Sequence, residues 1–251
     1  MDRLIYTALS GASQITANQA VTANNLANAS TSGFKAEMSA FRSVPVNGDG
    51  LATRAITAQT TPQSDLSPGP IEQTGRALDV AIDGPGWLAV QADDGSEAYT
   101  RNGNLQTDAT GVLRSGNRPV LSANGQPIVL PLNAKTTIGS DGTISALGAG
   151  EEPNTMAQVG QLKLVNTPGT SMQRGEDGLF RATPTNGEAA GALQSDDTVR
   201  VTSGALEASN VNPTETMIGM IDNARQFEMQ MKMLSSADDN ARSANQLLDV
   251  T

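Results

Sequence analysis

The sequence predicts an α+β protein with two terminal helices that form an antiparallel coiled coil. Between them it predicts a central all-β domain, barrel-like or sandwich-like, reached through an extended linker. Apolar residues near both ends recur at alternating steps of three and four, which places them on one face of a helix. The middle of the chain lacks this pattern and carries short apolar runs separated by Gly-containing turn dipeptides. A chain that leaves on one helix and returns on another can pair its own ends, which is the layout of an assembly subunit.

A first helix is expected from about Asp2 to Asn28, within an N-terminal coiled-coil region of residues 1–30. Only Asp2 and Arg3 carry a charge before Gly33, so other helices could surround this helix with little charge to desolvate. Gly33 can adopt the left-handed conformation and is expected to close the C-terminus of the helix. The positions of the apolar seam are Ile5, Ala8, Ala12, Ile15, Gln19, Thr22 and Leu26.

Residues 31–75 are expected to form an extended linker, because the segment from 44 to 70 is rich in Thr, Gln, Gly and Pro. One strand is expected within this linker, at about residues 51–58.

The β domain is expected over residues 76–198, where apolar runs alternate with turn dipeptides such as Asp94-Gly95 and Asn124-Gly125. Trp87–Val90 and Ala98–Thr100 are expected to form a hairpin. Trp87 is interpreted as a core anchor, with ligand stacking as the alternative. Further strands are expected at residues 78–82, 112–113, 127–130, 143–145, 160–165, 178–182 and 198–202.

A return linker over residues 199–212 is expected to lead into the C-terminal coiled-coil helix, residues 213–251. Asn212 is suited to cap this helix, Pro213 fits its first position, and Glu215 occupies the third position of a capping box. Its seam is Met217, Met220, Ala224, Phe227, Met231, Leu234, Asp238, Ala241, Asn245 and Leu248. Two acid–base pairs at a spacing of four should stabilise its exposed side: Glu228 with Lys232, and Asp238 with Arg242. Since both helices leave the same central body, they should run antiparallel.

Composition excludes several classes of function. The chain has no Cys and no His, so disulfides, thiolate sites and Ser-His-Asp or Cys-His catalysis are excluded. Its net charge is -10 and it has no Lys/Arg-rich run, which argues against nucleic acid. No stretch approaches the roughly 20 apolar residues of a membrane span. No catalytic, cofactor-binding, metal-binding or small-molecule site is expected, because the acidic pairs Asp93-Asp94, Asp196-Asp197 and Asp238-Asp239 are typical of turns, where neighbouring side chains point apart.

Several long motifs, in order, resemble the axial proteins of the bacterial flagellum. The rod and hook proteins of this family share signatures similar to residues 24–35, 78–87, 99–105, 108–111 and 203–211. Within the family the chain is most similar to the proximal-rod type, through Trp87 and residues 225–232, and the distal-rod and hook types are the near alternatives.

The resemblance implies a structural, non-enzymatic subunit of the basal-body rod. It implies export by the flagellar type III apparatus without a cleaved signal peptide, and assembly in the periplasm with other rod proteins and further copies of the chain. It places the terminal helices in an inner coiled-coil layer that transmits motor torque, and the β domain outside.

The residues expected to form the assembly interface lie on the two helices. They are Ile5, Leu9, Ile15 and Leu26, facing Met217, Ile221, Phe227, Met231 and Leu234. Asn24, Asn25 and Asn28 are expected to bind neighbouring subunits, with local capping of the helix end as the alternative. Two other classes of function remain open: a periplasmic protein that acts on peptidoglycan or binds carbohydrate, and a coiled-coil adaptor or adhesin outside the flagellum.

Overall fold

A computed structural model describes residues 2–45, 55–59, 63–132, 134–148, 156–167, 171–183 and 191–248. The chain divides into two compact units. We call the first the helix unit; it comprises Met1–Ala29, Ala36–Asp65 and Val211–Thr251. We call the second the β unit; it comprises Ser30–Lys35 and Leu66–Asn210. The segment predicted as an extended linker, residues 31–75, therefore contributes to both units.

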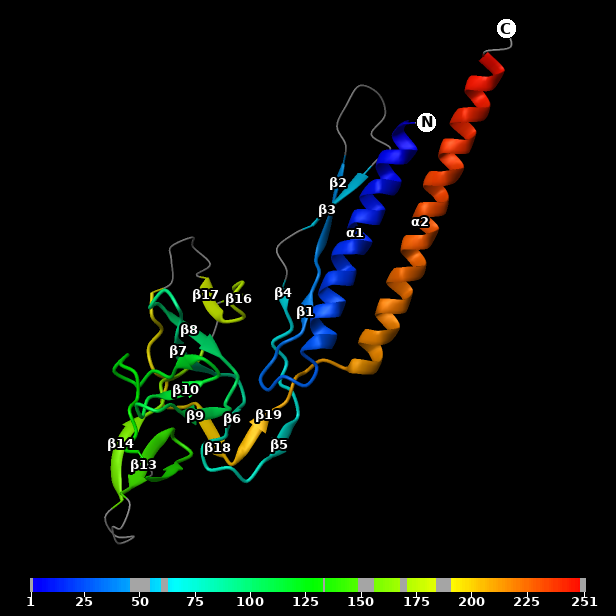
Figure 1. The fold of residues 1–251 in the computed structure, drawn as a ribbon. Helices are drawn as coiled ribbons and strands as arrows, with labels where there is room; N and C mark the ends of the chain where they lie inside the picture. The colour runs from blue at the N-terminus through cyan, green and yellow to red at the C-terminus, as the bar shows by residue number, and fades with distance from the viewer. Residues whose placement is uncertain are drawn as a thin grey trace. The chain divides into compact units, whose positions relative to one another are not determined.

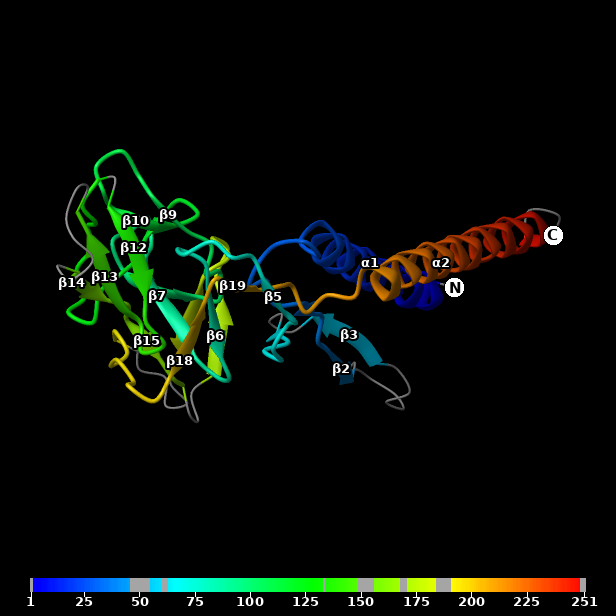
Figure 2. The same ribbon diagram turned by 90° about the horizontal axis from the view of Figure 1, so that it is seen from below.

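Two helices form the helix unit's long elements, as predicted. Helix α1 spans Asp2–Ala27 and α2 spans Pro213–Leu248, and they lie side by side in both ribbon views (Figures 1 and 2). The predicted cap is present, because the Oδ1 atom of Asn212 accepts hydrogen bonds from the amides of Thr214 (3.1 Å) and Glu215 (3.4 Å). The predicted ion pair between Asp238 and Arg242 is also formed, at 2.6 Å.

Neither described helix combines the length and apolar character that crossing a bilayer requires.

Four short strands complete the helix unit. Strand β2 (Phe41–Pro45) pairs antiparallel with β3 (Ala55–Gln59), and β1 (Glu37–Met38) pairs with β4 (Gln63–Ser64). Strands β1 and β3 contact α1, so this part of the chain runs beside the first helix (Figure 1). Of the strand predicted near residues 51–58, the part from 55 onward is observed and residues 51–54 lie outside the described residues.

The β unit is built from small antiparallel sheets. The largest has the strand order β15-β7-β8-β17-β16, formed by Leu164–Val165, Trp87–Gln91, Glu97–Thr100, Phe180–Thr183 and Ser171–Arg174. Its β7–β8 hairpin confirms the prediction, with Leu88 opposite Thr100 and Gln91 opposite Glu97.

Two three-stranded and two two-stranded sheets make up the rest. The orders are β12-β13-β14 (Lys135–Ile138, Thr143–Leu147, Ala157–Gln161) and β11-β10-β9 (Arg118–Pro119, Leu113–Ser115, Leu105–Thr107). The pairs are β18-β6 (Arg200–Ser203, Val80–Asp83) and β19-β5 (Ala205–Glu207, Ile71–Gln73).

The barrel alternative is not observed, since the sheets of the described residues stay separate and none closes on itself. The strand predicted at residues 127–130 is also absent; only isolated bridges, Leu121 with Pro127 and Val112 with Val129, occur there. Pro127 lacks the backbone N–H donor that a strand ladder requires, which explains the interruption.

The side chains of β7 alternate between two apolar clusters. Leu88 and Val90 belong to the larger cluster of the β unit, whereas Trp87 and Ala89 belong to a second one. The ring of Trp87 lies 4.6 Å from that of Phe180, centroid to centroid, and Trp87 is buried. Its predicted role as a core anchor is confirmed.

Candidate functional site

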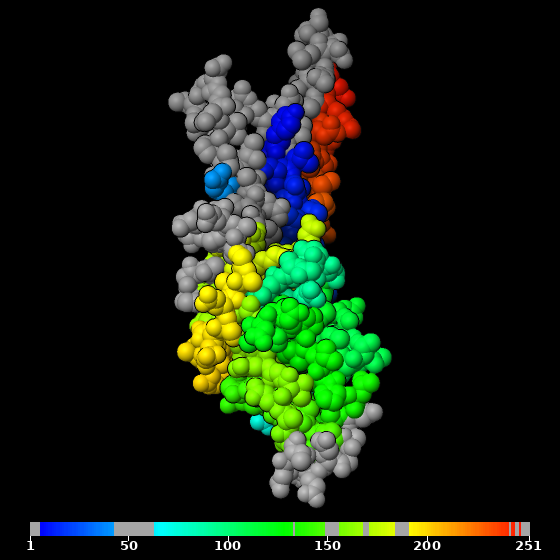
Figure 3. All heavy atoms as spheres, turned by 90° about the vertical axis from the view of Figure 1, so that its left-hand side faces the viewer, coloured from blue at the N-terminus to red at the C-terminus, as the bar shows by residue number. Residues whose placement is uncertain are grey.

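The contact between α1 and α2 depends on small side chains. Gly11 lies against Gln230, because a Cβ atom there would come within 3.2 Å of the Gln230 side chain. A Cβ atom on Gly219 would likewise lie 3.7 Å from the side chain of Thr22. Residue numbers therefore rise along α1 as their partners' numbers fall along α2. Among the side chains of the pair that the structure describes, the buried ones are Ala8, Ala12, Ile15 and Ala237. The helices are in contact in the space-filling view (Figure 3).

The two predicted seams differ in accuracy. On α1 the buried positions fall on the predicted seam. On α2 they are displaced by one residue at several turns, so that Met217, Ala224 and Met231 are exposed. The positions turned inward are Thr216, Gly219, Met220, Asn223, Gln230, Leu234 and Ala237. Met220 and Leu234 are on the predicted seam and face inward, but the remaining inward positions carry small or polar side chains, which apolar spacing alone does not identify.

Large apolar side chains are consequently left on the outside of the helix pair. They are between 39 and 69% exposed: Tyr6, Leu9, Met217, Ile218, Ile221, Phe227, Met229, Met231 and Met233. They do not form one stripe, since at about 100° per residue Met217 and Met229 lie about 120° apart around α2. A helix with apolar residues on several faces is typical of burial among other helices.

The predicted interface residues divide by exposure. Five of them are exposed in the single chain: Leu9, Met217, Ile221, Phe227 and Met231. Ile15 is buried inside the helix pair, and Leu26 and Leu234 are half-buried. Ile5 lies within α1, but its side chain is outside the described part of the structure.

The three asparagines at the end of α1 have different surroundings. The side-chain amide of Asn25 donates to the carbonyl of Glu37 and its oxygen accepts from the Glu37 amide, both at 2.8 Å. Asn28 donates to the carbonyl of Asn24 at 2.9 Å, and Asn24 itself is exposed. Asn25 thus connects the helix to β1 within the chain, and Asn28 caps locally.

A groove of about 380 Å³ opens between the helices. Its lining residues are Ile15, Thr16, Gln19, Asn223, Ala224, Phe227 and Glu228. The Oε1 atom of Gln19 is buried there and has no hydrogen-bond partner among the described residues. The groove is mostly apolar, which suits a side chain from another helix better than a reaction centre.

A second feature lies within the β unit, where three charged side chains are buried together. The Oε1 atom of Glu207 accepts a hydrogen bond from Nζ of Lys35 at 2.7 Å, and its Oε2 atom accepts from Nε of Arg101 at 2.7 Å. The three side chains are 1 to 5% exposed. We call this cluster the Glu207 node. It contains two cations and one anion, so both cations share the carboxylate of Glu207.

The environment of Glu207 stabilises its charged form. Burial is the largest single influence on its pKa and raises it. The hydrogen bond from Lys35, the charge of Arg101 and the amide of Gly69 together outweigh burial, so the pKa of Glu207 lies below its ordinary value. Sequence reasoning did not identify the node, although the quoted motifs at residues 24–35, 99–105 and 203–211 contain Lys35, Arg101 and Glu207.

Gly33 belongs to the node rather than to the helix end. It has the predicted left-handed conformation, with φ of 69°, but α1 ends six residues earlier at Ala27. Its amide donates to the carbonyl of Glu207 at 2.7 Å, and a Cβ atom would lie 2.3 Å from the carbonyl carbon of Arg101. The predicted capping role is therefore wrong; the position requires glycine because two backbones meet there.

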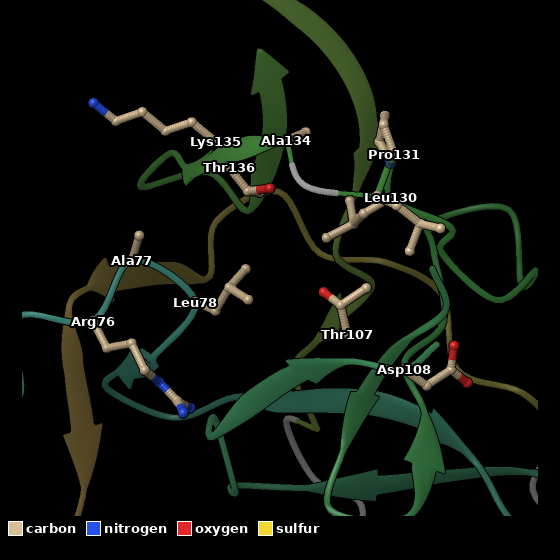
Figure 4. A pocket seen from close by; sticks show the side chains of 11 residues that line it. Arg76, Ala77, Leu78, Thr107, Asp108, Leu130, Pro131, Ala134, Lys135 and Thr136 are labelled. Carbon is tan, nitrogen blue, oxygen red and sulfur yellow. The ribbon is translucent and has the colours of Figure 1, made fainter. Parts of the chain in front are cut away.

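A cavity of about 470 Å³ elsewhere in the β unit tests the enzyme alternative (Figure 4). Leu78, Thr107 and Thr136 point toward it, whereas Lys135 extends away from it (Figure 4). Its carboxylate, Asp108, already binds Arg114 at 2.8 Å, and hydrogen bonds from Thr110 and Arg114 hold its pKa well below the usual range. Such an acid is poorly suited to proton transfer near neutral pH.

Two of the three acidic pairs, Asp93-Asp94 and Asp196-Asp197, lie at turns, whereas Asp238-Asp239 lies within α2. Oδ1 of Asp94 accepts from the amide and hydroxyl of Ser96 at 2.9 and 2.6 Å, and Asp196 binds Thr198 in the same way at 2.8 and 2.6 Å. These hydrogen bonds, led by those from the hydroxyls, lower the pKa of each carboxyl. They account for the aspartates through turn geometry.

Three family profiles match the chain in succession. They are described as "Flagella basal body rod protein" (residues 5–35), "Flagellar hook protein FlgE/F/G D1 domain" (residues 81–146) and "Flagellar basal body rod FlgEFG protein C-terminal" (residues 202–247). The first match ends at Lys35 and the third includes Glu207.

Relatives match over the full length. The chain is 52% identical to the flagellar basal-body rod protein FlgF of Salmonella typhimurium and 54% identical to that of Escherichia coli, with 100% of each chain covered. It is 34% identical to the flagellar basal-body rod protein FlgG of Bacillus subtilis, over 95% of this chain and 96% of the relative.

Proposed function

This chain belongs to the family of flagellar basal-body rod proteins, and on that premise we propose that it is a structural subunit of the flagellar rod. Its identity to the FlgF relatives, 52 and 54%, is well above its 34% identity to the FlgG relative, which favours the proximal-rod type. The role is mechanical: subunits associate head to tail through different surfaces, build a tube, and transmit motor torque.

The terminal helices form an antiparallel coiled coil in this proposal. The opposed numbering of the contacts Gly11–Gln230 and Thr22–Gly219 supports the antiparallel direction. The alternating steps of three and four along the α1 seam support the coiled-coil geometry.

The observation that carries the proposal is the set of exposed apolar side chains on the helix pair. Met217, Ile221 and Met231 are each about half exposed, at 51, 54 and 48%, although the intrachain seam is already formed without them. When neighbouring helices cover such side chains, each Å² of apolar surface removed from water stabilises the assembly by roughly 25 cal/mol of free energy. Neighbouring rod proteins and further copies of the chain are the partners that would cover them, with Met residues adapting to unlike contacts.

The remaining expectations of the family resemblance are carried here as part of the proposal. The subunit is exported by the flagellar type III apparatus without a cleaved signal peptide and is placed in the periplasmic part of the basal body. The proposed activity requires no catalysis, cofactor or small-molecule substrate.

The test replaces the three exposed apolar residues together, as Met217→Gln, Ile221→Gln and Met231→Gln. The matched control replaces three exposed polar residues of the same helix, as Asp222→Gln, Arg225→Gln and Lys232→Gln. We expect the first variant to be lost from purified basal bodies and its cells to be non-motile, because the contacts between subunits are removed. The control should be incorporated and motile. Normal incorporation of the first variant would overturn the proposed interface.

A further inference from the structure

The chain passes between its two units four times, and the four crossings share a neighbourhood in the β unit. The crossings lie at residues 29/30, 35/36, 65/66 and 210/211. Every path from the terminal helices into the β unit therefore passes through residues 30–35, 66–70 or 205–210.

One carboxylate joins these three segments. The Oε1 atom of Glu207 binds Lys35 and also accepts a hydrogen bond from the amide of Gly69 at 2.9 Å. The backbone carbonyl of Glu207 accepts a hydrogen bond from the amide of Gly33 at 2.7 Å. Glu207 itself lies three residues before the last crossing. Oε2 then binds Arg101, which belongs to the body of the β unit and not to a connecting segment.

Arg101 is fixed in that body. Its Nη1 atom donates to the carbonyls of Gly84 at 2.9 Å and Gly86 at 2.6 Å, beside its bond to Glu207. These carbonyl dipoles offset the second positive charge of the node, so the node stays buried with an unequal number of cations and anions.

Backbone contacts hold the segments too closely for side chains. A Cβ atom on Gly69 would lie 2.1 Å from the carbonyl oxygen of Ala208, and one on Gly33 would lie 2.3 Å from the carbonyl carbon of Arg101. Nζ of Lys35 also donates to the carbonyl of Ser67 at 2.7 Å, and the amide of Ala208 donates to the carbonyl of Pro70 at 2.8 Å. The three segments are thus packed on one another as well as on Glu207.

We propose that the Glu207 node is the mechanical junction of the protein, with Glu207 as the positioning residue that holds all connecting segments to the β unit. In the rod, load that passes between terminal helices and β unit goes through these segments; this part of the inference depends on the proposed function. Without the carboxylate, Lys35 and Arg101 repel one another and the segments separate from the body.

The test measures hydrogen exchange by mass spectrometry on the full-length protein carrying Glu207→Gln. The matched control is Glu97→Gln, which removes the carboxylate partner of another buried lysine. Glu97 binds Lys163 at 2.8 Å, and both side chains are at most 10% exposed. Glu97 lies in β8, and the hydrogen bonds described for its carboxylate come from Lys163 and Tyr99, which are outside the connecting segments.

In Glu207→Gln we expect exchange in residues 30–35, 66–70 and 205–210 to accelerate by about tenfold or more, with changes below about threefold in β10 and β13. Glu97→Gln should accelerate exchange around β7 and β8 and leave the connecting segments unchanged. Equal acceleration throughout the β unit in Glu207→Gln, or none in the connecting segments, would overturn the junction.

The functional arm compares swimming under increasing viscosity. Loss of Glu207→Gln protein from basal bodies, or its incorporation with reduced swimming at high load, supports the junction, provided that Glu97→Gln behaves like wild type. Normal incorporation and normal swimming at high load would overturn the mechanical role. Absence of the wild-type protein from basal bodies would instead refute the rod assignment, while the exchange result would still decide the junction.

Discussion

Charge counting in the Glu207 node predicts an unequal response to two substitutions that remove the same ion pair. Glu207→Gln leaves the cations Lys35 and Arg101 buried without an anion, which costs about 3–5 kcal/mol. The amide group of Gln also directs donor hydrogens at a site where Lys35, Arg101 and Gly69 all donate.

Lys35→Met should cost only about 1–2 kcal/mol, because a neutral pair of Glu207 and Arg101 remains. The carbonyl of Ser67, which loses Lys35, retains a hydrogen bond from Asn210 Nδ2 at 3.2 Å. Glu207 likewise retains its bond from Gly69.

The assay is denaturant unfolding at pH 7, followed by the fluorescence of the single tryptophan, Trp87, which is buried in the β unit. The midpoint should fall much further for Glu207→Gln, whose unfolding equilibrium shifts by roughly two to almost four orders of magnitude. A loss of stability in Lys35→Met equal to or larger than that in Glu207→Gln would refute the reasoning from charge balance.

Three further outcomes follow from the same contacts. The lowered pKa of Glu207 contributes stability that is present above the unfolded-state pKa of about 4.3 and is lost as the pH falls through the folded-state pKa. The free energy of unfolding of Glu207→Gln should therefore depend less on pH than that of wild type below about pH 4, as measured by acid titration. Gly33→Ala should lower the unfolding midpoint far more than Gly75→Ala. Both glycines have positive φ, but of the two only Gly33 would bring a Cβ atom against another backbone segment. Equal midpoints would contradict the steric argument. Ile15→Asp should reduce the helical circular dichroism of the isolated chain, because Ile15 is buried in the helix pair, whereas Met229→Asp on the exposed side should not; the reverse order would show that the seam is misplaced.

Features that depend on neighbouring residues could be predicted from the sequence. The start of α2 follows from Asn212 and Pro213, whose capping effects act within one turn, and the β7–β8 hairpin follows from a turn between two apolar runs. The α1 seam could be predicted because the residues that pack against α2 there are themselves apolar and recur at helical spacing.

Features that depend on distant partners could not be predicted. The α2 seam is set by the residues that lie against Gly11 and Thr22 of α1. The polar Gln230 therefore faces α1 and the apolar Met231 is exposed, the opposite of what their polarity predicts. The Glu207 node unites residues separated by 66 to 172 positions, and no local pattern connects them. The motifs quoted for the family resemblance, at residues 24–35, 99–105 and 203–211, contain all three members but do not indicate that these residues meet.

Cross-linking from single cysteines tests most directly whether the helix pair is the surface through which the protein assembles. The chain contains no Cys, so Ile221→Cys and, for comparison, Glu176→Cys on the exposed surface of the β unit each introduce a unique thiol. In isolated basal bodies, the thiol at residue 221 should cross-link to helices of neighbouring rod subunits and resist a soluble thiol reagent. Free reaction of that thiol with the reagent, with cross-links formed from residue 176 instead, would contradict the account.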